Sequence, residues 1–346
     1  MVSAFEGLSL QIASDLHLEM YDVPPSLEDI LTPSAPVLAL LGDISALGYM
    51  HGVKMYEHFL AECSRRFYMV LVLPGNHEFY NDGHSCRTQG DILEYMRNLS
   101  SAFPNVRLLE NSGITVNGVR ISGTALWSAV PEEAKRTVEF SMNDYNLIYV
   151  SDGGLRAGCQ GMGGEVAKLD AGTSAASSIL AGFLPIPSRS RSSNENSRFS
   201  RGPNSSGGGT STAVRRLCVA DSNALHEEAV RFLEREAEKA TQKRVNLLVL
   251  THHTPSFHGT SDPRHGVNPS GISSAFSTDL EHMLRNPRYA AIHTWCFGHT
   301  HFNSDQCLSG VRLVSNQTGY VQKPSMGYRR DLVIRVPKAY VERPSS

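Results

Sequence analysis

The chain has 346 residues, a formal net charge of −2 and 40% hydrophobic side chains. This is the composition of an ordinary globular protein, and the length allows one large domain or two with a sizeable core. The near-neutral balance gives no global field that would hold a polyanion. Constitutive binding of nucleic acid or of an acidic membrane is therefore not expected.

The cysteines show neither a CxxC spacing nor the density of a disulfide-stapled secreted domain, which predicts reduced thiols at Cys63, Cys86, Cys159, Cys218, Cys296 and Cys307. The opening stretch MVSAFEGLSLQIASD lacks the basic and apolar regions of a signal peptide. No later apolar run reaches the roughly 18 residues of a membrane span. We expect a cytoplasmic protein without a membrane partner, with the nucleus as the alternative location.

Strands and helices alternate in the predicted elements, which indicates an α/β protein. Short apolar runs bounded by turn residues predict strands at 8–13, 37–42, 67–75, 119–127, 245–252, 293–299 and 311–316. Several runs are continuous rather than alternating, as is typical of strands covered on both faces. Helical patterns occur at 51–67, 221–240 and 277–286. The expected N-caps are Asp221 or Ser222 for the second helix and Ser277 or Thr278 for the third.

Residues 151–214 break this pattern, because Gly, Ser, Ala, Asn and Arg dominate and large apolar side chains no longer repeat. Such a segment cannot bury enough apolar area to offset its chain entropy, so we predict a low-complexity insertion that is mostly disordered. The folded part is then one discontinuous domain, residues 1–150 and 215–346. We interpret the SRSRSS run as a solvated linker, with a phosphorylation site, an RNA contact or a protein-binding segment as alternatives.

Five of the predicted strands end in side chains that can bind metal. Asp15 and His17 follow the first strand two residues apart, a spacing that an extended chain directs to one side. Asp43 follows the second strand directly after a glycine. The remaining endings are Asn76, His77 and Glu78, then His252 and His253, then His299 and His301. Sites in open α/β sheets form at the carboxyl ends of strands, so we expect these side chains to meet.

The types of these side chains indicate the metal. Imidazole, carboxylate and amide ligands without thiolate suit Mn, Fe, Zn, Co or Ni better than Ca or Mg. About seven ligands exceed one tetrahedral site, so two ions are expected. Two ions about 3.5–4 Å apart, bridged by a carboxylate and a water, lower the pKa of that water and clamp a phosphate. A single histidine at a strand end is usually structural, but five such endings together favour a metal site.

In this order the residues resemble the pattern of the calcineurin-like metallophosphoesterases. That pattern runs Asp-x-His, Gly-Asp, Gly-Asn-His-Glu/Asp, one His after a strand, and Gly-His-x-His. In this chain the pieces read SDLH, LGD, PGNHE, THH and GHTH, and they cover both parts of the core. The resemblance implies a four-layer α/β/β/α sandwich of two mixed sheets flanked by helices. LPGNHEFY, SSAFSTDLE, FGHTHFNSD and SNQTGY look like a group of small, poorly characterised cytosolic members.

The resemblance also implies roles for individual residues. One metal ion would be held by Asp15, His17, Asp43 and His301, and the other by Asp43 as a bridge, Asn76, His252 and His299. His253 is the alternative to His252. His77 would face the scissile phosphate, stabilise its developing charge and protonate the leaving oxygen. A carboxylate should orient this imidazole, and the sequence does not identify it; Glu78 would point to the opposite face if the strand continued.

One position departs from the family pattern. The motif often continues as Gly-Asp-x-x-Asp, but Ala46 stands at its last position, so a charged residue sometimes found near the site is absent. The metal-binding Tyr of purple acid phosphatases and the GDYVDRG of protein Ser/Thr phosphatases are absent there as well. Other candidates for substrate contact, each with a plain structural alternative, are Tyr80, His258, His265, Arg329 and Arg330.

These observations predict a dinuclear metal-dependent phosphoesterase that hydrolyses phosphomonoesters or phosphodiesters with a metal-bridging hydroxide. The expected partner is a small phosphoester substrate, and nucleic acid is disfavoured by the near-neutral charge. The alternative is a scaffold or regulatory binding protein that keeps the fold and has lost most of the chemistry.

Overall fold

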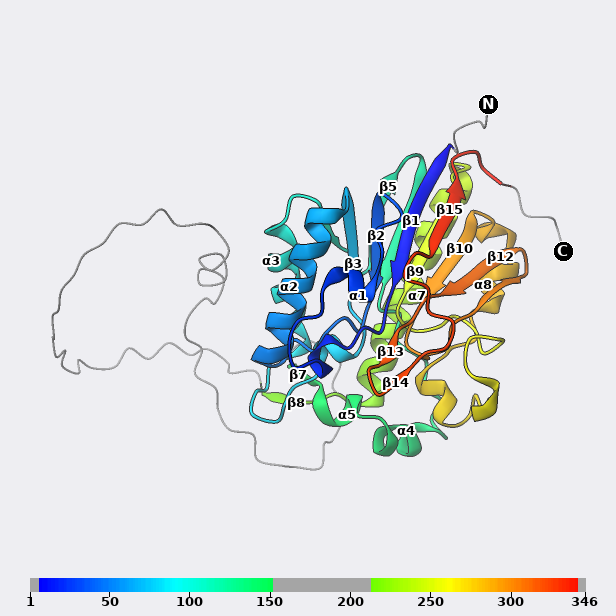
Figure 1. Ribbon diagram of the computed structural model, residues 1–346. Helices are drawn as coiled ribbons and strands as arrows, with labels where there is room; N and C mark the ends of the chain where they lie inside the picture. Colours follow the sequence, from blue (N-terminus) through cyan, green and yellow to red (C-terminus); the bar gives the residue numbers. More distant parts are fainter. Residues whose placement is uncertain (1–5, 152–212, 342–346) are drawn as a thin grey trace, which may run out of the picture.

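The computed structural model describes residues 6–151 and 213–341, with two large sheets at its centre (Figure 1). The first sheet has the order β15-β1-β2-β3-β4. β15 is antiparallel to β1, whereas β1 to β4 run parallel. Its strands are β1 (Gly7–Ala13), β2 (Val37–Leu41), β3 (Met69–Leu73), β4 (Val106–Leu108) and β15 (Val333–Pro337).

The second sheet has the order β11-β12-β10-β9-β6-β5. Its central strands β6, β9, β10 and β12 are parallel, and the strands at both edges are antiparallel to their neighbours. The strands are β5 (Ser112–Val116), β6 (Val119–Thr124), β9 (Leu247–Thr251), β10 (Ile292–Phe297), β11 (Asp305–Leu308) and β12 (Val311–Ser315). Both sheets are therefore mixed.

Three apolar clusters show how the layers stack. Leu248 and Leu250 of β9 pack against side chains of the first sheet, so this face of the second sheet lies between the two sheets. Leu247 and Val249 point to the other face and join the cluster of Phe232, in helix α7 (Val219–Gln242). Each of these leucines is fully buried, which stabilises the fold by about 1.5–3 kcal/mol per side chain. The alternation follows from the two-residue period of a strand.

The outer face of the first sheet is covered in the same way. Phe59 of α2 (Met50–Arg66) and Met96 of α3 (Gln89–Ser101) share a cluster with alternate residues of β2 and β3. Figure 1 shows α2 and α3 beside this sheet and α7 and α8 beside the other. The layers are thus helix, sheet, sheet and helix, and the predicted four-layer α/β/β/α sandwich is confirmed.

Smaller elements complete the fold. They are α1 (Leu27–Ile30), α4 (Lys135–Ser141), α5 (Asp144–Leu147), α8 (Glu281–Arg285), the hairpin β13 (Gly319–Tyr320) with β14 (Lys323–Pro324), and the pair β7 (Tyr149–Ser151) with β8 (Val214–Arg216). Short 3-10 turns lie at Leu18–Met20, His77–Phe79, Pro263–His265, Ile272–Ala275 and Pro287–Tyr289.

The predicted helix caps were wrong. α7 begins at Val219 after Cys218, so Asp221 is its third residue and Ser222 lies inside it. The Asp221 carboxylate instead accepts the N–H of Cys218 (3.0 Å), as the third residue of a capping box does. α8 follows Leu280. Ser277 is drawn into a bridge with Thr254, and the Thr278 hydroxyl accepts the N–H of Ala129.

Most of the predicted insertion lies outside the described residues, and so does its predicted disorder. Its two ends belong to the fold, because Ser151 of β7 pairs with Val214 of β8. The prediction of free thiols is confirmed for Cys63, Cys86, Cys296 and Cys307. The prediction was wrong for Cys218, which is disulfide-bonded, and Cys159 lies outside the described residues.

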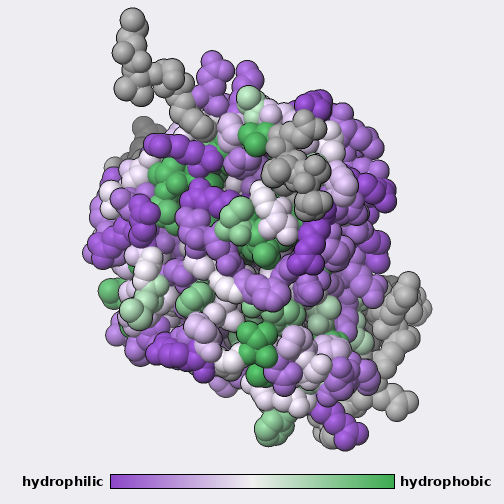
Figure 2. Space-filling model, turned by 90° about the vertical axis from the view of Figure 1, so that its right-hand side faces the viewer, coloured by the Kyte–Doolittle hydropathy of each residue, from purple (hydrophilic) through white to green (hydrophobic). Residues whose placement is uncertain are grey.

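Among the described residues, no helix is both long and apolar enough to cross a bilayer. On the face shown in Figure 2, apolar residues form separate patches between polar ones.

Candidate metal centre

Left-handed backbone conformations bring the candidate ligands together. Asp15, His17, Asp43, His299 and His301 all have positive φ, between 46° and 72°. The chain therefore turns at each strand end, and the expectation that Asp15 and His17 would extend the strand was wrong. A non-glycine residue in this region costs of order 1–3 kcal/mol and persists only where its surroundings impose it, often at a functional site.

Two glycines allow the loops after β2 and β3 to touch. Gly42 has a φ of 84°, and a Cβ there would lie 2.5 Å from the Gly75 nitrogen and 2.7 Å from Nδ1 of His252. A Cβ at Gly75 would collide with the Asp43 carboxylate. Any larger side chain at either position would push Asp43 and His252 apart.

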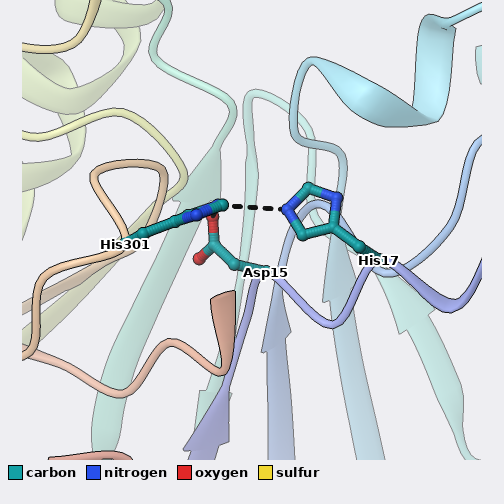
Figure 3. A group of neighbouring side chains, drawn as sticks. All are labelled: Asp15, His17 and His301. Carbon is teal, nitrogen blue, oxygen red and sulfur yellow. Dashed lines mark hydrogen bonds and ion pairs between the residues drawn. The ribbon is translucent and has the colours of Figure 1, made fainter. Parts of the chain in front are cut away.

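The first cluster of candidate ligands joins both ends of the chain (Figure 3). Nε2 of His301 lies 3.1 Å from Nε2 of His17 and 3.4 Å from Oδ1 of Asp15. Nε2 of His17 is 3.9 Å from Oδ2 of Asp43. Asp15, His17 and Asp43 are buried, and His301 is partly exposed. These oxygens and nitrogens face one another closely enough to share a cation.

The second cluster lies on the other side of Asp43. Oδ2 of Asp43 is 3.3 Å from Nε2 of His252, which is 3.1 Å from Oδ1 of Asn76. One ligand atom each from Asp43, His252 and His299 lie within 4.8 Å of one another. Asp43 belongs to both clusters, as a bridging carboxylate would.

The two adjacent histidines of the THH motif have different surroundings. His252 faces Asp43 and Asn76, and its Nδ1 lies 2.8 Å from the Leu41 carbonyl oxygen. Nδ1 of His253 is 2.8 Å from the Ser128 hydroxyl, and its ring stacks on His299 with centroids 4.1 Å apart. The geometry therefore brings His252 into the second cluster.

In the second cluster, the pKa values of two imidazoles are shifted in opposite directions. Burial opposes a charge on His252, but the carboxylates of Asp43 and Asp15 raise its pKa to about 10. Burial and the neighbouring His252 lower the pKa of His299 to about 3. His299 is therefore neutral, and its buried Nε2 has no hydrogen-bond partner. A buried nitrogen of this kind normally costs about 1–3 kcal/mol, and a metal ion would satisfy it.

His77 lies beside these clusters, and Glu19 is its carboxylate partner. The His77 backbone N–H donates to Oδ1 of Asp43 (2.8 Å), and Nδ1 of its ring lies 3.4 Å from Oε1 of Glu19. The same Glu19 oxygen is 3.3 Å from Nδ1 of His17, and its other oxygen accepts the N–H of Ala46 (3.2 Å). Burial opposes the charge on His77, but Asp43 and Glu19 raise its pKa to about 9.

Glu78 serves the backbone instead. Its buried carboxylate accepts N–H groups from Gly75 (2.6 Å), Ile44 (2.7 Å) and Asp43 (2.9 Å), which ties the loops after β2 and β3 together. Burial and the charge of Asp43 raise its pKa to about 7. The expectation for Glu78 assumed that the strand continued, whereas β3 ends at Leu73 and His77–Phe79 form a 3-10 turn.

Three further residues at the site were not predicted from the sequence: Glu19, Asp144 and Tyr320. Tyr320 of β13 packs its ring against His17 and His301, with centroid distances of 4.4 and 4.5 Å. Asp144 accepts hydrogen bonds from Asn76 and Tyr80. The available signals were the spacing of Glu19, which follows His17 by two residues, and the position of Tyr320 at the end of SNQTGY.

The weaker candidates divide between the site and other contacts. The ring of Tyr80 stacks on His77 with centroids 4.1 Å apart. His258 is paired with Glu281, Arg329 lies 3.6 Å from Asp331, and Arg330 donates to the Glu28 carbonyl oxygen. The side chain of His265 lies outside the described ones.

A cavity of about 530 Å³ opens onto the candidate ligands. Its lining includes Asp43, Asn76, His77, His299 and His301, together with Phe276, Tyr320 and Lys323. A small molecule can therefore reach the side chains of both clusters.

Comparison with known proteins gives relatives in sequence and in fold. No family model matches the chain. The chain is 25% identical over 323 residues to Uncharacterized protein L509 of Acanthamoeba polyphaga mimivirus, covering 90% of this chain and 91% of that protein.

Among solved structures, phosphopantetheinyl hydrolase (PptH) from Mycobacterium tuberculosis is similar with a TM-score of 0.58 at 16% identity, covering 96% of this chain and 97% of PptH. TT1561 of Thermus thermophilus is similar with a TM-score of 0.41 at 12% identity, covering 96% of this chain and 99% of TT1561. With the two mixed sheets and their flanking helices, the likeness to PptH shows that the chain has the calcineurin-like metallophosphoesterase fold.

Proposed function

We propose that the protein is a metal-dependent phosphoesterase with a dinuclear centre that hydrolyses small phosphomonoesters or phosphodiesters. One observation carries this proposal: the predicted ligands from five strand ends form two adjoining clusters that share Asp43. The clusters border a cavity that can admit a substrate. PptH, which has this fold, is a hydrolase, and this supports the reaction class.

The donor atoms fit divalent ions of intermediate hardness. One ion would be held by Asp15, His17, Asp43 and His301, and the other by Asp43, Asn76, His252 and His299. The unpaired Nε2 of His299 and the absence of sulfur from both sets fit Mn, Fe, Zn, Co or Ni. Two such ions, when bound, lower the pKa of a coordinated water and stabilise charge on phosphate oxygens.

His77 would act on the leaving group. Nδ1 of the imidazole lies beside Glu19, and in the metal-free protein Asp43 and Glu19 raise the pKa of His77 to about 9, which favours a proton on both nitrogens. It lines the cavity, so Nε2 can give its proton to the departing oxygen. Asp43 fixes the backbone of His77 and Tyr80 stacks on its ring, which limits the positions that the imidazole can adopt.

The first test measures metal content and hydrolysis together. Protein purified without added metal is analysed for bound metals, and p-nitrophenyl phosphate and bis-p-nitrophenyl phosphate are assayed before and after Mn²⁺ addition. We expect close to two ions per chain and activity that falls more than about 100-fold in Asp43→Asn, beyond the usual cost of losing a residue that only orients a ligand. The ratio of the two rates separates monoesterase from diesterase.

Exposed Asp22 provides the matched control, and Asp22→Asn should keep both metals and activity. Protein that stays inactive on both esters after Mn²⁺ loading would contradict the proposal and favour the scaffold alternative.

A further inference from the structure

Asp144, the first residue of α5, lies behind the candidate ligand Asn76. One of its oxygens, Oδ1, accepts hydrogen bonds from Nδ2 of Asn76 (2.8 Å) and from the Tyr80 hydroxyl (2.6 Å). Asn76, Tyr80 and Asp144 are all buried. Oδ1 of Asn76, at the opposite end of the amide, is 3.1 Å from Nε2 of His252. The amide thus bridges the Asp144 carboxylate and the second cluster.

The carboxylate decides which end of the amide faces the cluster. An ionised carboxylate only accepts hydrogen bonds, whereas an amide has a donating and an accepting end. If the amide were reversed, its oxygen would lie against Oδ1 of Asp144 in a buried place, where neither oxygen can donate a hydrogen bond to the other. The NH₂ group would then face His252 and Asp43, where it cannot bind a cation.

Tyr80 connects the same carboxylate to His77. Its hydroxyl donates to Asp144 and accepts from Nδ2 of Asn76 (3.3 Å), and its ring stacks on the His77 imidazole. The hydrogen bonds therefore fix the orientation of the Tyr80 ring, on which the His77 imidazole stacks. One buried carboxylate supports both the amide and the imidazole.

We propose that Asp144 is a positioning residue that fixes the Asn76 amide with its oxygen toward the second cluster and so creates a cation site there. This inference rests on the proposed function for the presence of a metal ion. It extends that function to a residue outside the five motifs. Residues that orient a metal ligand typically change affinity by about 10- to 100-fold when they are replaced.

The test measures Mn²⁺ binding by titration calorimetry and elemental analysis in Asp144→Leu and Asp144→Asn. Leucine has a similar volume and no acceptor, so we expect one of the two bound ions to become about 10- to 100-fold weaker. The ion held with Asp15, His17 and His301 should remain. Asparagine offers one oxygen that can accept both hydrogen bonds, so Asp144→Asn should bind both ions within a few-fold of the wild type.

A charge swap tests the contact without a change of size. Asn76→Asp alone places two carboxylates against each other and should weaken the same ion. Adding Asp144→Asn gives the new carboxylate a donor, and binding should recover by at least about tenfold, by the same range of affinities. Thermal melts of every variant show which of them fold. The swap provides the answer even if Asp144→Leu does not fold.

The outcomes separate the two proposals. Folded Asp144→Leu that binds both ions as tightly as the wild type, or a swap without recovery, would overturn the role of Asp144 while the phosphoesterase stands. Wild-type protein that binds two ions and hydrolyses neither ester would sink the phosphoesterase alone. Wild-type protein that takes up no Mn²⁺ would overturn both.

Discussion

Carboxylates shift the pKa values of the imidazoles at this site. Glu19 is one example. It lies between His17 and His77, with one oxygen 3.3 and 3.4 Å from their Nδ1 atoms. Burial opposes its charge, but hydrogen bonds to the two histidines lower its pKa to about 2. Its other oxygen accepts the N–H of Ala46 (3.2 Å), which fixes the position of the carboxylate.

This geometry predicts a substrate-dependent loss in Glu19→Gln. Without the charge, His77 holds its proton less firmly and is less well oriented. Esters with a poor leaving group, such as phenyl phosphate, should slow by about 100-fold, since general acid catalysis contributes 10²–10⁴-fold. The p-nitrophenyl ester, whose leaving oxygen needs little protonation, should slow much less.

The assay compares kcat for both esters at saturating Mn²⁺, because Glu19 also contacts His17. Glu28→Gln is the control, since the Glu28 side chain is exposed and its ion-pair partner Arg66 is exposed as well. An equal loss on both esters would show that Glu19 acts only through metal binding.

At the residue scale, the sequence was sufficient to predict the site residues that directly follow apolar strands. It was insufficient to predict the residues that support them. Asp43 and His252 could be predicted because strand ends converge in any α/β sheet. Asp144 and Tyr320 act through contacts across the fold, and so does Glu19 where it meets His77, and no spacing in the chain records those contacts. The left-handed turns at Asp15 and His17 were missed because their conformation is imposed by the surrounding loops.

At the scale of elements, the strands that carry the site were predictable and the edges were not. The seven apolar runs correspond to β1, β2, β3, β6, β9, β10 and β12. The edge strand β11 (Asp305–Leu308) was missed because it is short, begins with two polar residues and contains no buried residue. The start of α8 was misplaced because Ser277 and Thr278 bond to other segments, and tertiary contacts override a local capping signal.

The pairing of β7 with β8 indicates that a short turn can replace the segment between them. Ser151 and Val214 are direct partners in this antiparallel pair, so a two-residue Asn-Gly turn can join them in place of residues 152–213. We expect a melting temperature within about 2 °C of the wild type, which corresponds to roughly 1 kcal/mol in a chain of this size. Metal content and ester hydrolysis should be unchanged.

Differential scanning calorimetry and the two nitrophenyl assays check this variant. A second variant with a Gly-Gly turn controls for the choice of turn residues. Loss of the cooperative transition in both would show that the segment is part of the fold, against the prediction of a single discontinuous domain.

At the scale of the whole molecule, some buried histidines have a lowered pKa and others a raised pKa. Together they predict a stability maximum near neutral pH in metal-free protein. Burial lowers the pKa of His17, His253 and His299, so the unfolded chain binds more protons than the folded one below about pH 6.5. Stability must then fall as the pH drops. Burial raises the pKa of Glu78 and of Glu110 to about 7 and also raises that of Asp144, and these carboxyl groups oppose the slope.

The alkaline side has the opposite sign. His77 and His252 have pKa values of about 9 and about 10, so the folded chain keeps protons that the unfolded chain releases above about pH 6.5. Their contribution is complete below that pH and is lost as the pH rises through 9 and 10.

Melting temperatures of chelator-treated protein, measured from about pH 4 to pH 10, should therefore rise and then fall. Mn²⁺ should flatten the alkaline limb, because an ion takes the place of the proton on His252. A melting temperature that rises steadily to pH 10, with or without chelator, would contradict the charge arrangement assigned to His77 and His252.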